Sequence, residues 1–177
     1  MRLVLVLLLF HVGTVTAVTS TEWSTVTHVA GRQRILSQKM TKEFLLAAKG
    51  IATDDNEATM HATVALFDAS LSRLINGCAA DDIPEPPTQD IMDKLMTILG
   101  LWTPFKELLN TAVAATTINN TDLAQIAADN LPLLTESNAA VGLYVAAAIA
   151  ANATVPVSWW TLPAGSACLA SVCPRKP

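Results

Sequence analysis

The stretch that decides the fold of this 177-residue chain is Ala30-Gly31-Arg32-Gln33-Arg34-Ile35-Leu36-Ser37-Gln38-Lys39-Met40. A helix through it, at about 100° per residue, places a row of apolar side chains on one face, namely Val26, Val29, Met40, Phe44 and Ala47. Gln33 and Ser37 fall in the middle of that face, and Arg34 and Gln38 lie along its flank. A buried polar group costs free energy unless it is paired, so Gln33 and Ser37 need partners from another helix or from a ligand.

The same periodicity continues along the chain and predicts an all-α protein. We expect helices over about residues 20–49, from 53 or 54 to 76, from 89 to a turn at 119–122, and from there to about 150. Gly50 should end the first helix, and Thr53 or Asp54 should cap the second. Thr88 should cap the third helix, within which Pro104 is expected to introduce a kink and not a break.

Four long amphipathic segments joined by short loops predict an antiparallel up-down four-helix bundle. The first and last helices of such a bundle are neighbours. Their polar interruptions, Gln33 and Ser37 on one helix and Asn130 and Ser137 on the other, could therefore meet across the core. That pairing would satisfy the polar groups without a ligand.

Three segments are expected along the chain. Residues 1–17 resemble a secretory signal peptide, with Arg2 before an apolar run and a small-residue cleavage site at Val15-Thr16-Ala17. Residues 18–150 form the bundle, and residues 151–177 form an irregular tail that contains Trp159, Trp160 and two cysteines. No second stretch is expected to span a membrane once the signal is cleaved, so we predict a secreted or extracytoplasmic protein.

The formal charge of −4 argues against nucleic acid as a general partner. Basic residues nevertheless crowd the first helix, and such a local positive field attracts small anions. Most of them point away from the apolar face, as a solvated surface would; these are Arg32, Lys39, Lys42 and Lys49. Only Arg34 lies beside the apolar face.

The cysteine count leaves the disulfide pairing open. Cys168 and Cys173 could close a small loop, or either could join Cys78 and pin the tail to the bundle. At most one bridge forms among three cysteines, so one thiol is left over.

The motifs of enzymes and metalloproteins are missing from the sequence. Di-iron bundles need Glu-x-x-His pairs, whereas Glu57 and His61 are four residues apart. Zinc-ligand spacing, a haem-attachment motif, a phosphate-binding loop and a nucleophile elbow are likewise missing. We therefore expect no catalytic residues, no metal and no cofactor.

Several separated motifs together resemble the PilJ/NarX-like sensory domain, the extracytoplasmic N-terminal part of type IV pili chemotaxis transducers and nitrate/nitrite sensor kinases. The resemblance begins at residues 30–43 and continues through residues 71–77, the proline loop at 84–87, and residues 101–106, 130–134 and 138–144. It covers most of the chain after the signal and ends before the tail.

The resemblance implies a sensor bundle that works as a dimer, with the anion between the paired first helices of two subunits. Arg34 aligns with the arginine that holds the anion in nitrate-sensing members, and Gly31 would allow close approach of the helices. Ser37 and Gln38 would add secondary contacts. An arginine offers a fork of donors to a planar anion, which fits this role.

Two functional hypotheses follow. The first is a stand-alone, non-enzymatic sensory domain that binds a small nitrate- or nitrite-like anion, forms a homodimer through its first helix and acts with a separate signalling partner. The usual sensors continue into a membrane span and a signalling module, and this sequence stops after its tail. The second is a structural or interaction bundle that has kept the fold and lost the ligand.

Overall fold

The structure, a computed structural model, describes residues 17–114 and 119–153. It contains the helices α1 (Ser20–Ala48), α2 (Thr53–Asn76), α3 (Gln89–Ala114) and α4 (Asn120–Ala153), and the short 3₁₀ helix η1 (Ala79–Asp81). The described ranges hold no β-strand, only an isolated bridge between Cys78 and Ile83. The all-α prediction is confirmed. The predicted signal peptide and tail lie outside the described residues, apart from Ala17 and residues 151–153.

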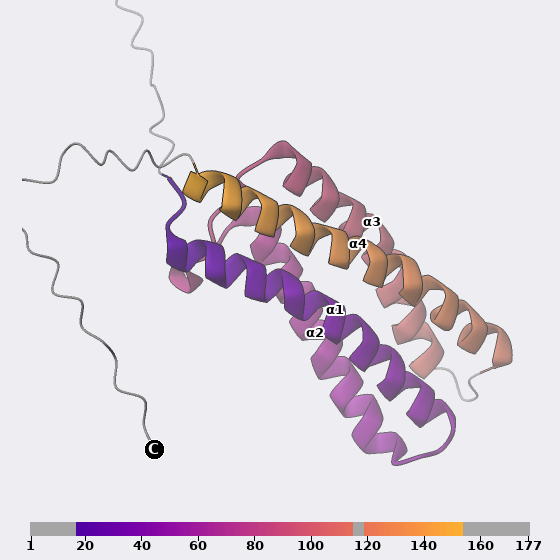
Figure 1. Cartoon of the computed structure of the whole chain (residues 1–177). Coiled ribbons are helices and arrows are strands. Elements are labelled where there is room, and N and C mark those ends of the chain that lie inside the picture. The colour runs from indigo at the N-terminus through magenta and orange to yellow at the C-terminus, as the bar shows by residue number, and fades with distance from the viewer. Residues whose placement is uncertain (1–16, 115–118, 154–177) are drawn as a thin grey trace, which may run out of the picture.

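The four helices form an up-down bundle (Figure 1). Helix α1 packs against α2 and α4, and α3 packs against α4 and, less extensively, against α2. The start of α1 and the end of α4 lie at the same end of the bundle, as Figure 1 shows. The predicted antiparallel topology, with the first and last helices as neighbours, is confirmed.

Helix α1 begins with a capping box. The Thr19 hydroxyl accepts a hydrogen bond from the Glu22 backbone N–H at 3.2 Å, and the Glu22 carboxylate accepts one from the Thr19 N–H at 2.7 Å. Hydrogen bonding to this carboxylate, first from the Thr19 backbone N–H and then from the Thr19 side chain, holds the pKa of the Glu22 carboxyl below its usual value. The helix ends at Ala48, and Gly50 supplies a positive φ of 71° as the chain turns.

The predicted cap of α2 is wrong. The helix begins at Thr53, after Ala52, and no side chain caps it. A capping side chain needs an extended backbone at the cap position, whereas Ala52 has a left-handed conformation with φ 42°. Instead, the Asn56 amide donates to the carbonyl of Ile51 at 2.8 Å and so ties the turn to the first turn of the helix.

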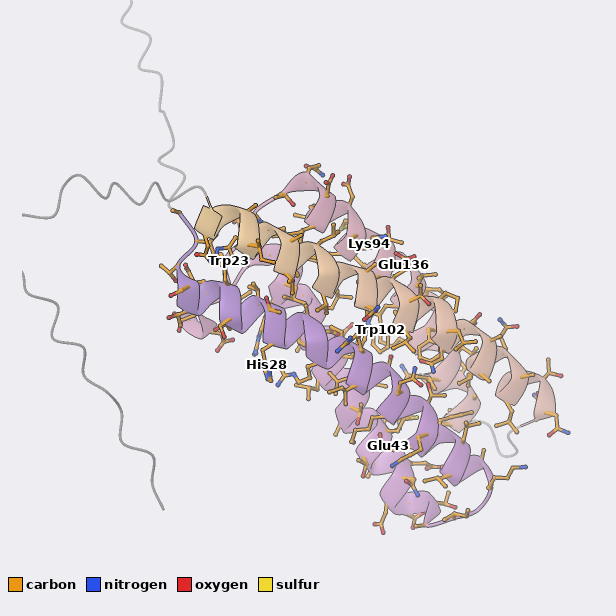
Figure 2. All side chains as sticks on the ribbon, in the orientation of Figure 1. Trp23, His28, Glu43, Lys94, Trp102 and Glu136 are labelled. Atoms are coloured by element: carbon orange, nitrogen blue, oxygen red, sulfur yellow. The ribbon has the colours of Figure 1, made fainter. Side chains whose placement is uncertain are left out.

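The remaining helix ends follow the sequence. The Thr88 hydroxyl accepts from the Ile91 N–H at 3.3 Å, as predicted, and the Asn119 side chain accepts from the Asp122 N–H at 2.9 Å. Pro104 lies inside α3 without interrupting it. Figure 2 shows Lys94 of α3 beside Glu136 of α4, whose ion pair at 2.6 Å joins the two helices.

The core consists of the inward rows of all four helices. Its largest fully buried side chains include Trp102, Tyr144, Phe44, Phe67, Phe105, Met40, Met60, Leu71 and Leu74. Gln33 and Ser37 of α1, and Asn130 and Ser137 of α4, are also buried, as the sequence predicts. The apolar face predicted for the helix through residues 30–40 is therefore the face of α1 that packs in the core.

The predicted pairing of these polar residues across the core is wrong. Gln33 donates to the hydroxyl of Ser70 in α2 at 2.8 Å, and Ser37 donates to the Arg34 carbonyl of its own helix at 2.9 Å. A serine within a helix can bond a carbonyl of the preceding turn, which removes its need for a distant partner. Among the described residues, Gln33 Oε1, Asn130 Oδ1 and Ser137 Oγ have no hydrogen-bond partner.

The prediction that no second stretch could span a membrane also needs correction. Helix α4 is long and apolar enough to do so by length and composition, with a mean hydropathy of 1.4 over its most apolar window. In the bundle it packs against both α1 and α3. Only 22% of that window is buried, so much of its apolar surface lies outside the core.

Asp68 of α2 accepts hydrogen bonds from Trp102 Nε1 at 2.7 Å and from Lys106 Nζ at 2.9 Å, both in α3. The bond from Trp102 and the charge of Lys106 hold the pKa of Asp68 below its usual value of 3.8. A carboxylate with a lowered folded-state pKa stabilises the fold above its unfolded-state pKa, and this stabilisation is lost as the pH falls through the folded-state value.

We therefore expect Asp68→Asn to reduce stability by a constant amount above about pH 5, and the difference from wild type to shrink below about pH 4. Urea unfolding of both proteins across this range measures it. A difference that grows on acidification would contradict the assignment.

Candidate functional site

The candidate site lies on the outer face formed by α1 and α4, where Arg34 is half-buried. Its Nη1 donates to Asn138 Oδ1 of α4 at 2.7 Å, and its Nε lies 3.5 Å from the carbonyl oxygen of Gly31. In the sequence, Arg34 lies between the buried Gln33 and the exposed Ile35, so its side chain borders the buried row that contains Gln33 and Ser37. This position beside the core row lets the side chain reach across to the neighbouring helix.

A groove of about 620 Å³ surrounds this pair of side chains. Its lining comprises Arg34, Ile35 and Gln38 from α1 and Leu134, Thr135 and Asn138 from α4. Four of these six side chains carry hydrogen-bond donors, and no carboxylate lines the groove. A site with one cation, neutral donors and apolar walls suits a small anion.

The four residues that the sequence singles out lie in different places. Arg34 and Gln38 line the groove. Gly31 contributes only its carbonyl oxygen, which faces Arg34. Ser37 is fully buried and donates to the Arg34 carbonyl, so it supports the helix beneath the groove and does not line it.

Sequence reasoning missed the α4 half of the groove. Asn138 provides the hydrogen bond that holds Arg34, and Thr135 adds a hydroxyl one turn earlier. Asn138 follows the buried Ser137 and Thr135 lies three residues before Asn138, so both fall outside the inward row of α4 from which the sequence prediction was made. The signal that could have revealed them is spacing, because Leu131, Thr135 and Asn138 fall on one exposed row of the helix.

That row extends along much of α4 and has a counterpart on α1. The members of the α1 row are Ser24, His28, Gly31, Ile35, Gln38 and Lys42, and those of the α4 row are Leu131, Thr135, Asn138, Gly142, Val145 and Ile149. Both rows alternate spacings of four and three, and all members except Gly31 are exposed. We call this surface the α1–α4 seam.

The apolar members of the seam are unusually open to solvent. Ile35 is 64% exposed, Leu131 62% and Ile149 65%. A second groove of about 450 Å³ lies farther along, between the start of α1 and the end of α4, and Trp23 and His28 in Figure 2 mark its α1 wall. The groove at Arg34 is thus one part of a longer, mostly uncharged face.

Residues 17–114 and 119–153 contain no group of three or more His, Cys, Asp or Glu side chains that could hold a metal ion.

Comparison with protein families identifies the class. The family described as "Type IV pili methyl-accepting chemotaxis transducer N-term" (PilJ) matches residues 24–129, which is more than half of the chain. The chain therefore belongs to this family of sensory domains, and the predicted resemblance is confirmed.

Comparison with solved structures finds the ligand-binding domain of the nitrate receptor McpN of P. aeruginosa. The sequences are 28% identical, the TM-score is 0.59, and the match covers 70% of this chain and 96% of that domain. A comparison with curated proteins gives no match. The fold and the family thus define a helical sensory domain of the ligand-binding type.

Proposed function

We propose that this chain is a sensory domain that binds a small planar anion of the nitrate or nitrite class in the groove between α1 and α4. The observation that carries the proposal is Arg34, a cation held at the groove by Asn138 with no carboxylate among the lining residues. The similarity to a nitrate receptor's ligand-binding domain supports the choice of anion.

The donors of the groove suit such a ligand. Arg34 uses Nη1 for Asn138, which leaves Nη2 for an anion oxygen. Because Asn138 accepts through Oδ1, its amide nitrogen remains available as a donor, and Gln38 supplies another amide. Hydrogen bonds from an ionised donor are about twice as strong as neutral ones, so Arg34 would provide most of the binding free energy.

We further propose that the binding unit is a homodimer that meets through the α1–α4 seam. A spacing of alternating threes and fours is that of helices packing against helices in coiled coils. A Cβ atom added at Gly31 or Gly142 would meet no atom within 4 Å, so neither glycine serves packing inside the protomer. Small residues on an open helical face would instead let a second copy approach closely.

Ile35→Glu should therefore dissociate the dimer, since a second copy would bring two carboxylates against an apolar contact. Sedimentation velocity at micromolar concentration measures the shift from dimer to monomer. Ile51→Glu is the matched control, because Ile51 is 54% exposed but lies in the turn after α1, away from the seam. A monomeric wild-type protein, or a dimer that survives Ile35→Glu, would contradict this interface.

We also propose that residues 1–17 are a cleaved secretory signal and that the bundle works outside the cytoplasm with a separate signalling partner. Membership of the PilJ family supports this placement. N-terminal sequencing of the exported protein would test it, with Val18 expected as the first residue.

The second candidate function is an interaction bundle that no longer binds a ligand. The observation that favours it is that Arg34 is already satisfied within the protomer, by Asn138 and by the Gly31 carbonyl. The two functions are separated by titrating nitrate, nitrite and chloride into the purified chain. Saturable heat with nitrate or nitrite supports the sensory function, and the absence of heat supports the interaction bundle.

A further inference from the structure

A cavity of about 730 Å³ lies at the end of the bundle where α1 begins and α2 ends. Its apolar walls include Val18, Ile83, Pro84 and Pro86, from the segment before α1 and the loop between α2 and α3. It is distinct from the α1–α4 groove, with which it shares no residue. We call it the end cavity.

Cys78 lines this cavity with a free thiol. The loop that carries it is well tied, because Cys78 and Ile83 exchange two backbone hydrogen bonds, at 2.6 and 3.1 Å. Gly77 precedes it with a φ of 71°, and a Cβ there would lie 3.0 Å from the Glu85 backbone nitrogen. The chain is therefore fixed where it presents the half-buried thiol to the cavity.

The chain returns to this end of the bundle when α4 finishes. Asn152 shares a groove with Trp23, and the adjacent Glu22 lines the end cavity, so the last turn of α4 lies near it. Cys168 lies fifteen residue steps along the chain from Ala153, with fourteen residues between them. At about 3.3 Å per residue they span up to about 50 Å, about twice the width of two packed helices.

The composition of residues 154–177 complements the cavity. This segment holds Trp159, Trp160 and Leu162 as large apolar side chains, contains no acidic residue and ends with Arg175 and Lys176. The cavity in turn is lined by apolar residues and two carboxylates, Glu22 and Glu85, and by no basic residue. Apolar surface and opposite charge both favour contact between them.

We propose that residues 154–177 dock in the end cavity and that Cys168 or Cys173 forms a disulfide with Cys78. In the reaction the two thiols lose two protons and two electrons as the S–S bond forms. A small-molecule disulfide such as oxidised glutathione accepts them and becomes two thiols, by exchange through a mixed disulfide. The inference is independent of anion binding and goes beyond the sensory function.

The test uses the full chain at low micromolar concentration in a glutathione redox buffer, followed by alkylation and peptide mapping without reduction. We expect a peptide containing Cys78 linked to the tail peptide within a single chain, and loss of the link in Cys78→Ser. Comparison of Cys168→Ser with Cys173→Ser shows which tail cysteine takes part. A Cys168–Cys173 bridge with Cys78 alkylated, three alkylated thiols, or a link between two chains would each overturn the proposal.

A second measurement tests docking without the covalent bond. In a variant carrying Cys168→Ser and Cys173→Ser, the docked tail should slow alkylation of Cys78. Adding Trp159→Ser and Trp160→Ser should then raise that rate several-fold, because the apolar contacts are lost. Equal rates in the two variants would show that the tail does not cover the cavity.

Discussion

Arg34→Ala is expected to weaken nitrate binding by about tenfold to a hundredfold, because it removes the charged donor of the groove at a cost of about 1.5–3 kcal/mol. None of the other residues that line the groove carries a positive charge that could replace the guanidinium of Arg34. Titration calorimetry on the variant and the wild type measures the ratio of dissociation constants. Equal affinities would show that Arg34 does not contact the anion.

Companion variants separate charge from geometry. Arg34→Lys keeps the charge but loses the planar fork, so its affinity should fall between the wild type and the alanine variant. Asn138→Ala should also weaken binding, since it releases Arg34 and removes an amide donor. Arg73→Ala is the matched control: it removes the same charge from α2, where Arg73 pairs with Asp81 at 3.1 Å, and should leave binding unchanged.

Trp102→Ala is expected to lower the free energy of unfolding by about 3–5 kcal/mol. Trp102 is 0% exposed, and its ring centroid lies 4.2 Å from that of Phe67. Its Nε1 donates a hydrogen bond to Asp68. Phe67 and Asp68 both lie on α2, and α2 packs against α3 less extensively than α1 packs against α2 or α4, or α3 against α4. Removing the indole therefore leaves a cavity at this smaller interface.

Urea unfolding measures this loss, and Trp102→Phe is its control. The phenyl ring keeps most of the apolar contact with Phe67 but cannot donate to Asp68, which is half-exposed and can bond to water. We expect its destabilisation to be clearly smaller than that of the alanine variant. Equal losses in both variants would place the effect in the hydrogen bond and not in the packing.

Much of the fold could be predicted because the helices are long and their apolar rows are regular. Seven buried positions of α1 follow from its periodicity alone, among them the polar Gln33 and Ser37, whereas the burial of Glu43 was not predicted. What periodicity cannot supply is the partner of a buried polar side chain. Ser37 bonds its own helix and Gln33 bonds α2, because helix rotation and separation decide which atoms come within reach.

The start of α2 shows a second limit. Thr53 and Asp54 are good capping residues by type, but capping depends on backbone conformation as well. The left-handed Ala52 leaves no extended residue before the helix. The preference of Thr53 and Asp54 for capping positions was thus overridden by the left-handed backbone of the turn after α1. No local sequence motif indicates that conformation.

The candidate site was predictable only in part, for a related reason. Arg34 stands out because a basic residue lies beside an apolar row, and the family resemblance adds to its weight. Its partner Asn138 lies 104 residues away and became visible only when α1 and α4 were placed together. A groove between helices depends on residues from both sides, whereas sequence patterns describe each helix alone.

The most direct test of the account is a calorimetric titration of nitrate into the purified wild-type chain. We expect saturable heat that chloride does not reproduce, from a site that contains Arg34, Gln38 and Asn138. No heat with nitrate or nitrite at millimolar concentration would contradict it, and the chain would then be a sensory-family bundle without an anion ligand.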